Sequence, residues 1–132
     1  MTHGFIRDYW DLSYGKIQKF LEWFQAENAL SDEAKTVFAN EYVRYGFSAV
    51  WRNRDARAKM SKQNQRKWVE DFYSLPLTRQ LLAYANPQGR LAAKMAKTLQ
   101  SRNVAKVLRL AATIDFISVH FSGLLTHLRQ SR

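Results

Sequence analysis

The sequence contains no cysteine. This absence excludes disulfide bonds, thiolate zinc sites, iron–sulfur clusters and thiol catalysis, and it favours a cytoplasmic location. The sequence also lacks a run of about 18 apolar residues that could span a bilayer. Its first residues do not form a basic segment followed by an apolar stretch, so we expect neither secretion nor a membrane-spanning segment, and no membrane among the expected partners.

Residues that could form a catalytic centre are also scarce. No Gly-rich phosphate loop, nucleophile elbow or pair of catalytic carboxylates occurs. Of the three histidines, His120 and His127 lie seven residues apart, which is not a zinc-ligand spacing. Asp115 is the one acid within an apolar segment, and we expect it to form a structural salt bridge. The sequence therefore predicts a protein that is not an enzyme and has no metal or cofactor; an enzyme would need a partner or a metal to complete its site.

Glycine and proline are rare, with five and two residues. Apolar residues recur at spacings of three and four, which is typical of helices, and no convincing strand pair is present. A chain of 132 residues closes one hydrophobic core. We predict an all-α, single-domain bundle of about five or six helices spanning residues 1–132. The helices are expected near residues 13–28, 32–51, 62–75, 78–85 and 87–100, followed by a last helix after Ser101.

Several residues predict where these helices begin. Ser31 is expected to cap the second helix, and Ser61 or Asn64 the third. The pair Asn86-Pro87 resembles a cap followed by proline at the first helical position. The last helix carries the clearest apolar repeat, with successive spacings of three and four, and it is the expected spine of the fold. This repeat comprises Val107, Leu110, Ile114, Ile117, Phe121, Leu124 and Leu128.

Charge is distributed unevenly along the chain. Residues 1–43 carry four Lys or Arg and seven Asp or Glu, net −3, whereas residues 44–132 carry seventeen and four, net +13. No acidic residue occurs between Asp71 and Asp115. Such one-sided charge favours a polyanionic partner, and nucleic acid is the default polyanion in the cytosol. A solvated basic surface without a partner and an anionic membrane surface are the weaker alternatives.

The most basic segment is residues 52–67. It contains no large apolar residue except Met60, so we expect either an exposed, mobile connection or an extension of the second helix. Trp51 and Trp68 flank it and, with Tyr84, are candidates for stacking on bases. Its candidate nucleic-acid-binding residues are Arg52, Arg54, Arg57, Lys59, Lys62, Arg66 and Lys67.

Two basic triplets follow, each with the spacing i, i+4, i+7. The first comprises Arg90, Lys94 and Lys97. The second comprises Arg102, Lys106 and Arg109. This spacing stacks three cations on one helical face, where they repel each other unless a counter-charge is supplied. A phosphate backbone supplies that charge, so we interpret both triplets as nucleic-acid-binding residues.

A short, cysteine-free, basic helical bundle with these features resembles the small-subunit family of multi-protein CRISPR effector complexes. The resemblance covers the whole chain and is architectural; it is carried by the segment 52–67, the two triplets and the apolar last helix. It implies contact without sequence preference to single-stranded DNA, RNA or an RNA–DNA hybrid, within a channel. It also implies assembly beside larger subunits and beside copies of the same chain.

Two other interpretations remain open. A plasmid or phage DNA-binding accessory protein would prefer a defined duplex sequence and would dimerise. A helical protein–protein adaptor would dock a partner helix on the apolar seam, and its basic surface would be incidental. Salt-insensitive partner binding without nucleic-acid affinity would indicate the adaptor.

Overall fold

The structure is a computed structural model that describes residues 8–120, with side chains described as far as Ile117. Within this part of the chain there are six α-helices and no strand, so the predicted all-α bundle is confirmed. None of these helices is long and apolar enough to cross a membrane. In chain order the elements are α1 (Tyr9–Ala26), α2 (Asp32–Arg52), the 3-10 helix η1 (Ala56–Ala58), α3 (Lys62–Phe72), α4 (Pro76–Leu81), the 3-10 helix η2 (Leu82–Tyr84), α5 (Arg90–Gln100) and α6 (Val104–His120).

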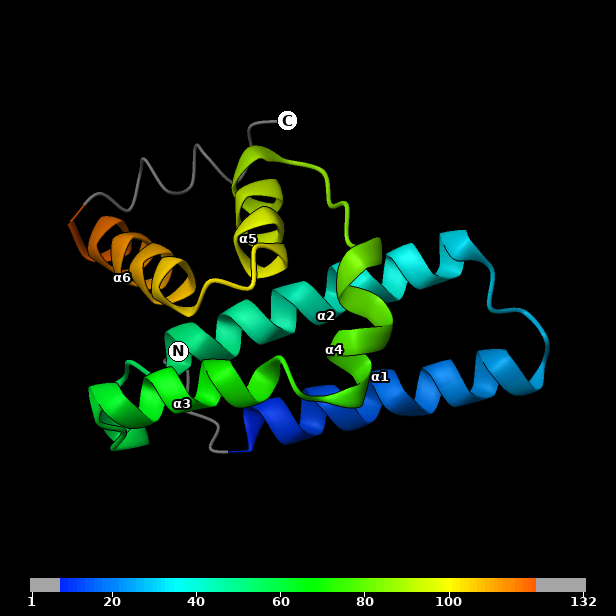
Figure 1. The fold of residues 1–132 in the computed structure, drawn as a ribbon, viewed down its shortest axis with the longest axis horizontal. Coiled ribbons are helices and arrows are strands. Elements are labelled where there is room, and N and C mark those ends of the chain that lie inside the picture. Colours follow the sequence, from blue (N-terminus) through cyan, green and yellow to red (C-terminus); the bar gives the residue numbers. More distant parts are fainter. Residues whose placement is uncertain (1–7, 121–132) are drawn as a thin grey trace.

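Helix α2 is the centre of the bundle. It packs against each of the other five α-helices, and Figure 1 shows α1 and α3 on one side of it and α5 and α6 on the other. The expectation that the last helix is the spine of the fold was therefore wrong. In α6, Val107 and Ile114 are buried as the repeat predicts, while Leu110 and Ile117 are only partly buried. The three remaining members of that repeat lie outside the described residues.

Side-chain caps explain where three of the six described α-helices begin. The Ser31 hydroxyl accepts a hydrogen bond from the Ala34 N–H at 3.1 Å, and the Ser61 hydroxyl accepts one from the Asn64 N–H at 3.0 Å. Both caps confirm the sequence expectation, because a side-chain oxygen satisfies one of the unpaired amides of the first turn. At α6 the cap is Asn103, whose Oδ1 accepts from the Lys106 N–H at 3.0 Å.

Some helix ends differ from the prediction. Helix α1 begins at Tyr9 and not near Ser13, because Trp10 packs into the core and extends the helix by a turn. Helix α3 ends at Phe72, ahead of the turn that precedes Pro76. Helix α5 begins at Arg90 and not at Pro87, since Gly89 adopts φ 95°, which ends any helix that Pro87 could start.

The basic segment 52–67 is neither a long mobile connection nor an extension of α2. Helix α2 ends at Arg52, and α3 already begins at Lys62. Between them the side chain of Asp55 caps η1 by accepting a hydrogen bond from the Arg57 N–H at 2.8 Å. More than half of the segment therefore belongs to helices, which its lack of apolar residues did not predict.

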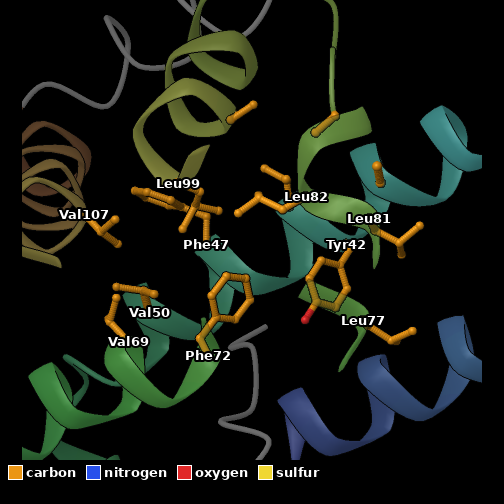
Figure 2. Packing of buried hydrophobic residues seen from close by; sticks show 14 of the residues in the cluster. Tyr42, Phe47, Val50, Val69, Phe72, Leu77, Leu81, Leu82, Leu99 and Val107 are labelled. Atoms are coloured by element: carbon orange, nitrogen blue, oxygen red, sulfur yellow. The ribbon is translucent and has the colours of Figure 1, made fainter. Parts of the chain in front are cut away.

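The core combines aliphatic side chains from every α-helix with a cluster of aromatic rings. Figure 2 labels core residues that α2, α3, α4, α5 and α6 contribute. Phe72 stacks on Tyr42 with ring centroids 5.5 Å apart. Trp68 also stacks on Phe72, with ring centroids 5.8 Å apart. Trp10 meets Phe72 at 5.6 Å in a tilted arrangement. The buried Tyr42 hydroxyl is paired with the hydroxyl of Thr78, so its polar group is satisfied. The cluster joins α1, α2 and α3. Helices α5 and α6 also pack against α2.

Gly46 allows Phe72 to approach α2 closely. A Cβ atom at position 46 would lie 2.9 Å from Phe72 Cε1 and 3.2 Å from Cζ, whereas a Cβ at Gly15 would meet nothing within 4 Å. We expect Gly46→Ala to lower the free energy of unfolding by about 1–3 kcal/mol through overpacking. Gly15→Ala, the matched control in α1, should raise it by about 0.5–1 kcal/mol through helix propensity. Urea unfolding of both variants checks this, and equal shifts of the same sign would contradict the packing described.

The ionisation of Tyr73 makes the stability of the fold depend on pH in the alkaline range. Its hydroxyl donates to the Leu99 carbonyl at 2.7 Å, and burial raises its pKa from 10.0 to about 12. The neutral hydroxyl therefore contributes fully below about pH 10, and its contribution is lost as the pH rises through the folded pKa. We expect Tyr73→Phe to reduce the decline of the melting temperature across this window. Burial also raises the pKa of Tyr42, which affects both proteins equally; identical declines would contradict a buried Tyr73 hydroxyl.

Candidate nucleic-acid interface

Helix α5 presents one basic face to solvent. Arg90, Lys94 and Lys97 are all exposed, whereas Ala96 and Leu99 on the other side are buried. The Thr98 hydroxyl donates to the Lys94 carbonyl at 2.7 Å, so this side chain bonds its own helix and does not compete for a ligand. The structure thus confirms that the first triplet shares one helical face, as its spacing predicts.

The second triplet is arranged differently from the prediction. Arg102 precedes α6 and lies in the turn after α5 with φ 58°, in the left-handed region. Its guanidinium lies over the Tyr73 ring, 5.4 Å from the centroid. Only Lys106 and Arg109 belong to α6, where both are exposed. The prediction that three cations share one face of the last helix was therefore wrong, because the chain turns at Arg102 before α6 begins.

That turn brings the two helices together around a shared hollow. Lys94 and Thr98 of α5 line it from one side, and four residues of α6 line it from the other. We call this hollow, of about 410 Å³, the α5–α6 groove. Its α6 residues are Lys106, Arg109, Leu110 and Thr113. Cations that are 12 and 15 residues apart in sequence therefore border the same groove.

No acidic group neutralises these cations. None of the six residues of the two triplets forms an ion pair with another residue in the described part of the chain, and no acid occurs between Asp71 and Asp115. The Thr113 hydroxyl donates to the Arg109 carbonyl at 2.9 Å, and no carboxylate among the described residues lines the groove. The groove is a concentrated positive potential facing solvent, which attracts anions.

The cations of segment 52–67 are mostly engaged. Arg54 pairs with Asp115 at 3.5 Å, and Arg57 pairs with Asp55 at 2.8 Å. This pairing lowers the pKa of the Asp55 carboxyl to about 2, chiefly through the Arg57 side-chain hydrogen bond.

Three of the remaining cations of this segment contact an acid or an aromatic ring, and two have no ion pair among the described residues. Within α3, Arg66 lies 3.7 Å from Glu70 and Lys67 lies 3.4 Å from Asp71. Arg52 stacks over the Tyr9 ring at 4.1 Å. Among the described residues, Lys59 and Lys62 have no ion pair. The segment therefore offers a more neutral surface than its composition suggests.

The three aromatic candidates for base stacking occupy different environments. Trp68 is stacked on Phe72 within the core cluster, and Tyr84, 36% exposed, lies beneath the Lys35 ammonium at 5.2 Å from its centroid. Trp51 is partly buried, and its indole N–H donates to Asp115 Oδ1 at 2.9 Å. The expected structural salt bridge of Asp115 is confirmed by its contact with Arg54. The side chains of His120 and His127 lie outside the described residues.

Sequence reasoning missed a second hollow, of about 380 Å³, between α2, α5 and α6. We call it the Trp51 pocket. Phe47, Trp51, Leu91 and Met95 provide apolar walls, and its mouth includes Gln88 and Gly89. No sequence pattern indicated it, because its walls come from three helices that meet only in the fold.

The described residues contain no group of three or more His, Asp or Glu side chains placed to hold a metal ion. The two hollows are instead lined by cationic, aromatic, aliphatic and neutral polar groups. No protein-family model, no curated protein sequence and no solved structure matches this chain.

Proposed function

We propose that this protein is a non-catalytic binder of nucleic-acid backbone, and that the α5–α6 groove is its principal contact. The observation that carries the proposal is the convergence of Lys94, Lys106 and Arg109 on one groove that no acid neutralises. Arg90, Lys97 and Arg102 extend the positive surface along the same two helices and the turn between them. Phosphates spaced along a strand are the counter-charge that such an array binds.

The proposed contact recognises the charge of the phosphate backbone and not the base sequence. The groove-lining cations reach phosphates, while the groove's two threonine hydroxyls donate to carbonyls of their own helices and so have no further proton to donate to base edges. Binding through several phosphates releases condensed counterions and therefore weakens steeply with salt. The ligand class is single-stranded DNA, RNA or an RNA–DNA hybrid.

The second part of the proposal is that the chain works as a small subunit of a larger nucleoprotein complex, such as a CRISPR effector. Large apolar side chains remain exposed on α1 and the start of α2: Leu12 is 66% exposed, Phe20 47%, Trp23 59% and Val37 61%. Phe20 of α1 stacks on Phe38 of α2. Exposed large apolar side chains are typical of protein contacts. These side chains also favour the adaptor, as the second candidate function.

Fluorescence anisotropy separates these functions. The full chain is titrated into labelled single-stranded DNA, duplex DNA and single-stranded RNA of mixed sequence, at low and at near-physiological salt. The proposal predicts binding at low salt that is equal for unrelated sequences and falls steeply with salt. A strong preference for one duplex sequence would indicate an accessory DNA-binding protein. No binding even at low salt would overturn the proposal and favour the adaptor.

A further inference from the structure

The Trp51 pocket is not used by the backbone contact. Its apolar walls and its volume of about 380 Å³ place it at the small end of the range of ligand sites. Two helices, α5 and α6, contribute to both the pocket and the groove. A ligand of the pocket therefore lies close to whatever occupies the groove.

Trp51 is held in one orientation at the pocket wall. Its Nε1–H donates to Asp115 Oδ1 at 2.9 Å, and Asp115 Oδ2 in turn lies 3.5 Å from Arg54 Nε. Asp115, which is 64 residues away from Trp51 in sequence and is itself paired with Arg54, thus fixes the indole ring. A ring that is already fixed offers a stacking surface without further loss of side-chain freedom.

The pocket also contains polar groups at its edge. The Ser48 hydroxyl and the Gln88 side-chain amide both line it, and neither makes a hydrogen bond to another residue in the described part of the chain. A flat heteroaromatic ring fits this arrangement, because its faces stack on apolar and aromatic side chains while its edge takes hydrogen bonds. An aliphatic ligand would leave both polar groups unused.

The pocket and the groove adjoin along α5 and α6. Met95 and Ile114 line the pocket, and their direct neighbours in sequence, Lys94 and Thr113, line the groove. Gln88 and Gly89, which also line the pocket, directly precede Arg90, the first cation of α5. The phosphates of a bound strand remain on the basic face while a base can turn toward the pocket.

We propose that the Trp51 pocket takes one unpaired nucleobase of the strand whose backbone lies in the α5–α6 groove. The inference rests on the proposed function and deepens it: the protein holds single strands through phosphates and anchors them by one base. Duplexes, whose bases are stacked and paired, bind through the groove alone. Because stacking tolerates every base, the anchor adds affinity without strong sequence preference.

The test compares two ligands with the same phosphates. The full chain is titrated into labelled oligothymidine and into a fully abasic strand of equal length, so that backbone contacts are matched whatever the register. We expect the abasic strand to bind about tenfold more weakly, the loss of one stacked base. Both affinities should fall with salt in parallel, because the phosphate contacts are the same.

A pocket-filling variant locates the base. Ala92 lines the pocket, and Ala92→Phe is expected to lower the affinity for oligothymidine to the abasic level while leaving the abasic affinity unchanged. Ala26→Phe, on an exposed position at the end of α1, is the matched control and should keep the tenfold difference. If Ala92→Phe loses helix content, Ser48→Ala removes only the hydroxyl and should still reduce the difference, by about threefold.

Each outcome decides between the two proposals. Equal binding of both strands, with steep salt dependence, would overturn the base pocket and leave the backbone function standing. A tenfold difference that persists in both pocket variants would place the base elsewhere and also overturn it. Failure of both strands to bind at low salt would overturn the proposed function itself.

Discussion

Reversing the charges of Lys94 and Lys106 together is expected to lower the affinity for every nucleic-acid sequence by about 100-fold at low salt. The two side chains border the α5–α6 groove from opposite helices. Each charge-assisted phosphate contact contributes about 1.5–3 kcal/mol, and two lost contacts therefore exceed the roughly 2.7 kcal/mol that a 100-fold change requires. Both residues are exposed, so helix content should not change. Anisotropy titrations of Lys94→Glu/Lys106→Glu measure the effect.

The matched control is Lys16→Glu with Lys19→Glu. These lysines are exposed on α1, away from the groove, and their reversal changes the net charge by the same amount. If the groove is the site, the control should lose less than about threefold, since long-range charge is screened. Equal losses in both variants would show that only net charge matters. Unchanged affinity in the groove variant would move the site to segment 52–67, where Lys59→Glu/Lys62→Glu is the next variant.

Truncating Phe72 is expected to cause the largest loss of stability. Its side chain is 2% exposed and contacts the rings of Trp10, Tyr42 and Trp68. Phe72→Ala should lower the free energy of unfolding by about 3–5 kcal/mol, because the cavity cannot collapse around a rigid aromatic cluster. That loss is a large part of the total stability of a small domain. Urea unfolding followed by circular dichroism measures it.

Phe20→Ala provides the control for Phe72→Ala. The same side chain is removed, but Phe20 is 47% exposed, so the expected loss is below about 1 kcal/mol. Similar losses at both positions would contradict the core described for α1, α2 and α3. A large loss at Phe20 alone would show that the exposed apolar surface is covered in solution.

Local patterns predicted the helices well because their chemistry is local. Ser31 and Ser61 cap helices by accepting hydrogen bonds from amides three residues away, which sequence spacing reveals. The basic face of α5 also follows from spacing alone. The central helix was misidentified because α2 packs against other helices on all sides, where Ala39, Gly46 and Ala49 allow close approach. The apolar residues of α2 therefore do not form a single stripe in the sequence.

The sequence predicted only part of the candidate site, because the site depends on how segments that are distant in sequence pack together in the fold. The residue at the turn between α5 and α6 is Arg102 with a positive φ, a conformation that favours glycine, so nothing in its type indicated a helix break. The pairing of Arg54 with Asp115 crosses 61 residues. This pairing links Arg54, a candidate phosphate contact, to the carboxylate that accepts the Trp51 indole N–H.

The salt dependence of binding tests the central claim most directly. Six cations of α5, α6 and the intervening turn, each contributing roughly 0.7 for a single strand, predict that log K falls against log salt concentration with a slope of about −4. The Lys94→Glu/Lys106→Glu variant should give a slope of about −3. A slope near zero, or the same slope in both proteins, would contradict a groove that holds the nucleic-acid backbone.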